Sequence, residues 1–311
     1  MADDPQQNIL VIKLGALGDI ILALGPFAAI RQHHPDAKIT LLTTPAFRAF
    51  LESSGYFDEI WMDSRPSLLQ VSDWLNLKSR LRQGSFSRVY DMQTSDRSGW
   101  YFRLFGSQRR PEWSGIARGC SHPHANSDRD YMHSIERQDE QLAMAGIPSV
   151  PSADLSWVTA DTGRFGLEKR FVLLVPGGAP HRLAKRWPAE RYAELAQTLA
   201  GLGIQPVILG SSAEAPLARE IMSTCSSAKN LCGQTDLADI AVLAREAAGA
   251  VGNDTGPIHM TAATGCPTVV LFSAVSDPSI TAPRGTVVEV LRRDNLADLS
   301  VESVAAALSL R

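Results

Sequence analysis

Residues 249 to 273, GAVGNDTGPIHMTAATGCPTVVLFS, decide the fold class of this chain. The order of apolar and polar runs predicts a strand ending at Val251, a polar turn, a helix from Ile258 to Thr264, and a second strand over 268–272. In an open α/β sheet, such a turn lies at the carboxyl end of a strand, where ligands bind. The stretch therefore predicts an α/β protein with a ligand site at this turn.

Asp254 and Thr255 fall at the cap and first turn of the predicted helix. The free N–H groups and positive dipole end of a helix start suit an anion, and Gly256 lets the backbone approach that anion closely. The ordinary alternative is that Asp254 and Thr255 only cap the helix. Taken by itself, the turn leaves both interpretations open.

Length, charge and cysteine usage limit the class of protein. A chain of 311 residues exceeds a typical single core, which predicts two domains. The formal net charge of -3 gives no global electrostatic case for nucleic-acid binding. Four cysteines without C-x-x-C spacing indicate free thiols in a reducing cytosol. Because Gly25-Pro26 breaks the apolar run over 20–30, we expect neither a signal peptide nor an integral membrane segment.

The first half opens with a predicted strand, turn and helix. Asn8–Leu14 is typical of a buried parallel strand, and a G-x-x-G-D turn leads from it into an apolar helix predicted over 20–33. A dinucleotide site needs G-x-G-x-x-G and an acidic residue after the second strand, whereas Thr43-Thr44-Pro45 stands there, so NAD binding is disfavoured. Asp19 lies at the helix start, either as a cap or as a functional acid.

An arginine-rich region with interleaved aromatic side chains covers residues 97–118. Such a region suits a nucleic acid, an anionic membrane surface or an anionic small substrate, but a solvated loop and helix face explains it equally well. A polar loop further on contains His122, His124 and His133. We expect no metal site there, because no second cluster of ligands matches them.

The second half also alternates strand and helix. The predicted strand Phe171–Val175 runs into a glycine-rich turn containing Gly178 and then into a basic cluster containing Lys185. A glycine-rich turn followed by a mobile cation suits phosphate oxygens, although a solvated basic turn is an equal alternative. Glu214 follows the next predicted strand, 205–209, and would either accept bonds from ribose hydroxyls or cap a helix.

Several segments, taken in order, resemble the ADP-heptose:lipopolysaccharide heptosyltransferase family, glycosyltransferase family nine. They are VIKLGALGDIILAL, VPGGAPHRLAKRWP, LGSSAE, LCGQTDL and GNDTGPIHMTAATGCPTVVLF, and together they span both halves. The resemblance implies the α/β GT-B fold, with two Rossmann-like domains whose parallel sheets face a central cleft. The acceptor-binding domain would cover residues 1–155 and the nucleotide-sugar-binding domain 156–311, with the last helix able to pack back on the first domain.

The resemblance also implies roles for particular residues. Asp19 would be the general base, and Lys185 the second catalytic residue, acting on the departing diphosphate. The implied donor-binding set is Gly178, Lys185, Glu214, Asp254, Thr255, Gly256 and His259. The guessed acceptor-binding set is Gly18, Arg97, Arg103, Arg109 and Arg110, whose arginines match no invariant motif of the family.

The implied activity is inverting transfer of a heptose from ADP-heptose to a lipopolysaccharide inner-core acceptor, without a metal or other cofactor. The implied partners are a nucleotide-sugar donor and an acceptor at the inner face of the cytoplasmic membrane, with no nucleic acid. The protein would be cytoplasmic, and peripheral at that membrane. The alternatives are a family member that uses another nucleotide sugar or acceptor, and a non-catalytic nucleotide-sugar-binding protein.

Overall fold

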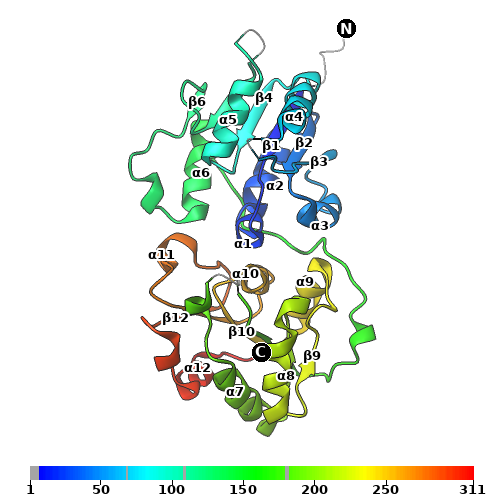
Figure 1. The fold of residues 1–311 in the computed structure, drawn as a ribbon, viewed down its shortest axis with the longest axis vertical. Helices are drawn as coiled ribbons and strands as arrows, with labels where there is room; N and C mark the ends of the chain where they lie inside the picture. The colour runs from blue at the N-terminus through cyan, green and yellow to red at the C-terminus, as the bar shows by residue number, and fades with distance from the viewer. Residues whose placement is uncertain (1–6, 68, 108–109, 179–181) are drawn as a thin grey trace. The chain divides into compact units, whose positions relative to one another are not determined.

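The computed structural model describes residues 7–67, 69–107, 110–178 and 182–311. The chain forms two compact units, residues 1–153 and 154–311, each built on its own six-stranded sheet (Figure 1). The domain boundary predicted after residue 155 lies close to this division. None of the helices in the described ranges is long and apolar enough to cross a bilayer.

The first unit has a sheet in the order β3-β2-β1-β4-β5-β6, in which all neighbouring strands are parallel. Its strands are β1 (Asn8–Ile12), β2 (Lys38–Thr43), β3 (Glu59–Met62), β4 (Arg88–Asp91), β5 (Glu112–Gly115) and β6 (His122–Pro123). Its helices are α1 (Leu17–Ile21), α2 (Leu24–His33), α3 (Arg48–Glu52), α4 (Val71–Gln83), α5 (Asp96–Leu104) and α6 (Ser134–Met144). The central strand β1 is almost entirely buried, as expected where helices cover both faces of a parallel sheet.

The path of the chain fixes which helices share a face of this sheet. The chain moves from β1 through β2 to β3, then returns through β4 to β5 on the other side of β1. Because such crossovers are right-handed, the two directions place their helices on opposite faces. Accordingly α4 contacts α5, and α2 contacts α6. The loops after β1 and β4 therefore diverge at a switch point, where sheets of this kind bind ligands.

The single apolar helix predicted over 20–33 is wrong, because α1 ends at Ile21 and α2 begins at Leu24. Pro26 is the physical reason, since it has no N–H to donate to the carbonyl of Leu22. That carbonyl instead accepts the side-chain amide of Gln138 from α6, at 3.3 Å. The break separates the short helix that carries Asp19 from the longer α2.

The second unit repeats the design with the strand order β12-β11-β10-β7-β8-β9. Its strands are β7 (Phe171–Val175), β8 (Gln205–Ile208), β9 (Lys229–Asn230), β10 (Gly249–Asn253), β11 (Thr268–Phe272) and β12 (Val288–Arg292). Its helices are α7 (Ala189–Gly201), α8 (Ala215–Thr224), α9 (Leu237–Glu246), α10 (Gly256–Ala263), α11 (Pro278–Thr281) and α12 (Val301–Ala307). Its switch point lies between the adjacent strands β7 and β10.

The last helix, α12, packs on α7 within the second unit, whereas we expected it to be able to return to the first domain. Val301, Val304 and Leu308 belong to the same buried core as Leu195 and Leu199 of α7. Removal of these apolar side chains from water is the physical reason for the position of α12.

Candidate active site

The side chain of Asn253, at the end of β10, joins the loops of the switch point in the second unit. Its amide donates to the carbonyls of Pro176 and Gly177, at 2.9 and 3.0 Å. Its Oδ1 accepts the N–H of Trp187 and the hydroxyl of Tyr192, at 3.0 and 3.1 Å. Because Asn253 is fully buried, these bonds fix the glycine-rich turn after β7 against the start of α7.

Replacing Asn253 by Ala should therefore destabilise the second unit by about 2–4 kcal/mol, because the Trp187 N–H and two carbonyls would be buried without partners. Calorimetric melting of the variant measures the loss as a lower Tm. Thr198→Ala is a matched control, since it removes one hydrogen bond, to the Glu194 carbonyl, on an exposed helix face. If both variants have the same Tm as the wild type, the side chain of Asn253 does not hold the turn.

Lys185 and Asp254 form a partly buried ion pair beside this turn. Lys185 ends a 3₁₀ turn, Leu183–Lys185, and its Nζ lies 2.6 Å from Asp254 Oδ2. The Lys185 and Asp254 side chains are only 12% and 8% exposed. His259 of α10 approaches the other carboxylate oxygen, with Nε2 3.7 Å from Oδ1. Burial raises the pKa of Asp254, but His259 and Lys185 together lower it by more, so the pKa lies below its ordinary value. Asp254 is thus ionised and orients the ammonium of Lys185.

The start of α10 follows Asp254, the acidic member of this ion pair, directly in the chain. α10 begins at Gly256 after the N-cap residue Thr255, whose side chain makes no cap bond. Its hydroxyl donates to the carbonyl of Asn253, at 3.2 Å. A Cβ placed at Gly178 would lie 3.7 Å from Thr255 Cγ2, so the glycine-rich turn passes close to the helix start. N–H groups without a cap acceptor, next to an ammonium, form a site suited to an anion.

Glu214 follows β8 in the chain and ends the 3₁₀ turn Ser212–Glu214. Its Oε2 accepts the N–H and the hydroxyl of Ser211, at 2.8 and 2.6 Å, which confirms the capping interpretation. A Cβ at Gly177 would lie 2.8 Å from Glu214 Cγ, and one at Gly210 would lie 2.8 Å from Glu214 Cβ. Glycine at both positions therefore brings the ends of β7 and β8 together around Glu214. Contact of Glu214 with a ribose stays a prediction.

In the first unit, Lys13 joins the loops that follow β1 and β4. The Lys13 side chain is almost completely buried, and its Nζ donates to the carbonyl of Met92, at 2.9 Å. The turn then reaches Gly18 and Asp19, both of which are partly exposed. Asp19 Oδ2 accepts the N–H of Ala16, at 2.9 Å. This hydrogen bond holds the Asp19 carboxylate at the switch point of the first sheet.

The negative charge of Asp19 influences two cations that we did not predict, Lys13 and Arg137. Burial lowers the pKa of both Lys13 and Arg137. The negative charge of Asp19 raises both pKa values, but by less than burial lowers them. A single lysine in the apolar run NILVIKL was a sequence signal for Lys13. Arg137 lies on α6, far along the chain, and no motif pointed to it.

Asp91, at the end of β4, lies behind the same loops and is fully buried. Its Oδ1 accepts the N–H groups of Gln93 and Thr94, at 3.2 and 3.0 Å. Burial raises the pKa of Asp91 from 3.8 to about 6, although the bond from Thr94 acts against this rise. The Asp91 carboxyl group thus binds its proton more tightly in the folded protein than in the unfolded chain. Protonation of Asp91 therefore stabilises the fold, with the full effect below pH 3.8, and this stabilisation is lost as the pH rises through about 6.

Asp91→Asn should remove this loss, because the amide can accept the same two N–H bonds without becoming charged. The whole shift corresponds to at most about 3 kcal/mol, of which about 1.4 kcal/mol falls above pH 5. We therefore expect the Tm of the variant to rise relative to that of the wild type between pH 5 and pH 8. Differential scanning calorimetry at both pH values measures this. Equal pH dependence of the two proteins would show that Asp91 does not titrate in this range.

The four arginines of the guessed acceptor-binding set do not lie together. Arg97 lies in the first turn of α5, at the carboxyl edge of the sheet, and donates to the carbonyl of Pro66, at 3.2 Å. Arg103 and Arg110 flank the far end of α5 and the start of β5, which places them at the amino edge. Arg109 lies outside the described residues. Among the described members of this set, only Arg97 and Gly18 share the sheet edge of Asp19.

The histidines of the polar loop have local partners. His124 Nε2 lies 3.2 Å from Glu140, and His133 Nδ1 lies 3.0 Å from Glu136. Across the described ranges, no group of three or more His, Cys, Asp and Glu side chains is arranged to hold a metal ion.

Two Rossmann-like units, each with polar groups gathered at the switch point of its parallel sheet, are the building blocks of the GT-B fold. Among proteins with this fold, the chain belongs to glycosyltransferase family 9. The family model described as glycosyltransferase family 9 (heptosyltransferase) matches residues 74–306.

Known proteins agree with this assignment. The chain is 34% identical to lipooligosaccharide heptosyltransferase 2 of Haemophilus ducreyi, over 92% of this chain and 88% of that protein. It is 26% identical to lipopolysaccharide heptosyltransferase 2 of Escherichia coli, over 92% and 88% of the two chains. It shares the fold of the E. coli heptosyltransferase WaaC solved with ADP, at a TM-score of 0.77 and 19% identity, over 96% and 98% of the two chains.

Proposed function

We propose that this protein transfers a heptose from ADP-heptose to a lipopolysaccharide inner-core acceptor, with inversion at the anomeric carbon. The observation that carries the proposal is the partly buried Lys185–Asp254 pair next to the uncapped start of α10, in a family 9 chain. The names of the relatives support the acceptor class. The WaaC structure with ADP supports an adenine nucleotide as the leaving group.

The donor would bind at the switch point of the second unit. The ammonium of Lys185 and the first N–H groups of α10 would hold the diphosphate, since both are oriented before the ligand arrives. Gly178 and Gly256 would let the backbone approach the phosphates. Asp254 and His259 would keep Lys185 in position, and Glu214 would lie near the nucleoside.

The chemical step uses Asp19 as general base. As the acceptor hydroxyl oxygen attacks the anomeric carbon, its proton passes to the Asp19 carboxylate, and the bond from that carbon to the diphosphate oxygen breaks. The bonding electron pair leaves with ADP, whose added negative charge is stabilised by Lys185 and the helix start. A base in this role contributes about 10²- to 10⁴-fold in rate. Since these groups supply the positive charge, the step needs no metal or other cofactor.

The acceptor would meet the protein at the inner face of the cytoplasmic membrane, where a cytoplasmic enzyme binds peripherally. Gly18 and Arg97 share the sheet edge of Asp19 and would line the acceptor side. Arg103, Arg109 and Arg110 remain candidates for attraction of an anionic acceptor over a longer range.

A donor panel tests the proposal. Titration calorimetry with ADP, UDP and GDP should show tightest binding of ADP, and transfer to a heptose-deficient core acceptor should proceed from ADP-heptose in the presence of EDTA. Preference for UDP would overturn the donor while leaving the fold intact. Binding of ADP-heptose without transfer or hydrolysis would instead indicate a non-catalytic binding protein.

A further inference from the structure

The outer face of α4 carries apolar and cationic side chains in one stripe, and we propose that this face docks on an anionic lipid bilayer. Val71, Leu75, Lys78 and Arg82 recur at helical spacing, so they lie along the same side of α4. Val71 and Leu75 are 62% and 58% exposed, although apolar side chains of this size usually lie inside a protein. Leu77 and Leu81 supply the core from the neighbouring side of α4, so the stripe runs along one flank of the exposed surface of this helix.

The neighbouring helix α5 extends this surface. Trp100 is 57% exposed, and the guanidinium carbon of Arg103 lies 4.5 Å from the centre of the Trp100 ring. α5 buries Ser98 and Phe102 on its inner side, and α4 and α5 lie on the same face of the sheet. An exposed tryptophan next to a cation is typical of side chains at a membrane interface, because the ring is apolar and its N–H is polar.

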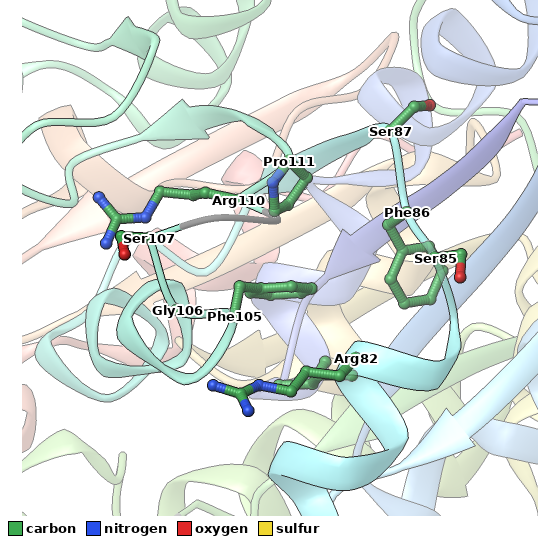
Figure 2. Close-up of a pocket in the computed structure, with 10 residues that line it drawn as sticks. Arg82, Ser85, Phe86, Ser87, Phe105, Gly106, Ser107, Arg110 and Pro111 are labelled. Atoms are coloured by element: carbon green, nitrogen blue, oxygen red, sulfur yellow. The ribbon is translucent and has the colours of Figure 1, made fainter.

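Two adjoining pockets connect the stripe to the amino edge of the sheet. One, of about 490 Å³, includes Leu75 and Lys78, and the other, of about 960 Å³, includes Phe105 and Arg110. Both are lined by Arg82 and Ser85. Figure 2 shows the guanidinium groups of Arg82 and Arg110 extending to the same side of the larger pocket, and the Phe105 ring lies between the two arginine side chains in this view. Two cations over an apolar floor suit a lipid phosphate with its attached hydrocarbon.

Charge complementarity identifies a bilayer as the partner. The whole chain has a net charge of -3, yet Lys78, Arg82, Arg103 and Arg110 gather on this face, where Asp96 adds an acid at the start of α5. Basic side chains beside exposed apolar ones bind anionic membrane surfaces by joint electrostatic attraction and apolar burial. The inference extends the proposed function, whose acceptor is built on a lipid, but its surface does not include Asp19 or Lys185.

Flotation with lipid vesicles tests the docking surface. Wild-type protein should bind vesicles containing phosphatidylglycerol, with affinity that falls as salt rises, and should bind phosphatidylcholine vesicles weakly. Leu75→Ser with Lys78→Glu should weaken binding to the anionic vesicles at least about tenfold, because a contact cation becomes an anion and an apolar group is lost. Leu202→Ser with Arg219→Glu, at exposed positions of the second unit, is the matched control and should bind as the wild type does.

The proposal is overturned if the wild type does not float with anionic vesicles at low salt, or if the α4 variant floats equally well. It is also overturned if the α4 substitutions abolish self-association of the protein in the absence of lipid, since the face would then bind a second copy. Transfer to a delipidated acceptor, measured in parallel, separates the two proposals. The α4 variant should retain this transfer, whereas a wild type without any transfer would refute the proposed function and leave the docking surface standing.

Discussion

Asp19→Asn should lower kcat for heptose transfer by about 10²- to 10⁴-fold, because the amide cannot take the acceptor proton. The change should leave the Kd for ADP unaltered, since the groups that we assign to the nucleotide all belong to the second unit. Single-turnover transfer kinetics and titration calorimetry measure these two quantities. A large effect on the rate with no effect on nucleotide binding is the pattern of a catalytic base.

The design of this variant separates catalysis from structure. The carbonyl oxygen of Asn can still accept the N–H of Ala16, as Asp19 Oδ2 does at 2.9 Å. Asp19→Ala removes that bond as well, and so reports the structural part of the effect, which is about 1 kcal/mol for a lost helix cap. An Asp19→Asn protein with near wild-type transfer would exclude Asp19 as the base, whatever the behaviour of the alanine variant.

Lys185→Met should weaken ADP binding by about 10- to 100-fold, the size expected for loss of a charge-assisted bond to phosphate. It should also lower kcat, because the charge on the departing diphosphate would lose its nearest cation. The single variant has a second effect, however, since it leaves the Asp254 carboxylate buried without its ammonium partner, which destabilises a protein.

The double variant Lys185→Met with Asp254→Asn distinguishes the two effects. Neutralising Asp254 removes the unpaired buried charge, so the Tm should recover toward that of the wild type, while ADP binding should remain weak. Calorimetric melting and nucleotide titration of both variants provide the comparison. Recovery of ADP affinity together with stability would mean that Lys185 serves the fold alone and does not contact the donor.

Several strands could be predicted, because each of them depends on a local apolar run, whereas β5, β6 and β12 were not predicted. Lys38–Thr43, Glu59–Met62, Phe171–Val175 and Thr268–Phe272 have the predicted bounds. A buried parallel strand needs only consecutive apolar residues bounded by polar turns. The helix predicted over 20–33 failed at Pro26, whose effect depends on the backbone hydrogen bond that it cannot form.

The arginine-rich region shows why spacing in the chain does not define a site. Arg97 and Arg103 lie on the same helix, but six residues of helix separate them by about 9 Å along its axis. α5 thus carries Arg97 to the carboxyl edge of the sheet and Arg103 toward the amino edge. Arginines that are close in the sequence are therefore divided in the fold between the two edges of the sheet.

The sequence by itself determined the alternation of strands and helices, the two parallel sheets, and the polar turns that hold Asp19, Gly178 and Asp254, because these features follow from patterns within a few residues. Only the tertiary structure decided which of those side chains meet. Lys185 and Asp254 are 69 positions apart in the chain, yet they pair at 2.6 Å because β7 and β10 are neighbours in the sheet. Strand adjacency is set by the packing of the whole unit, so no local pattern contains it.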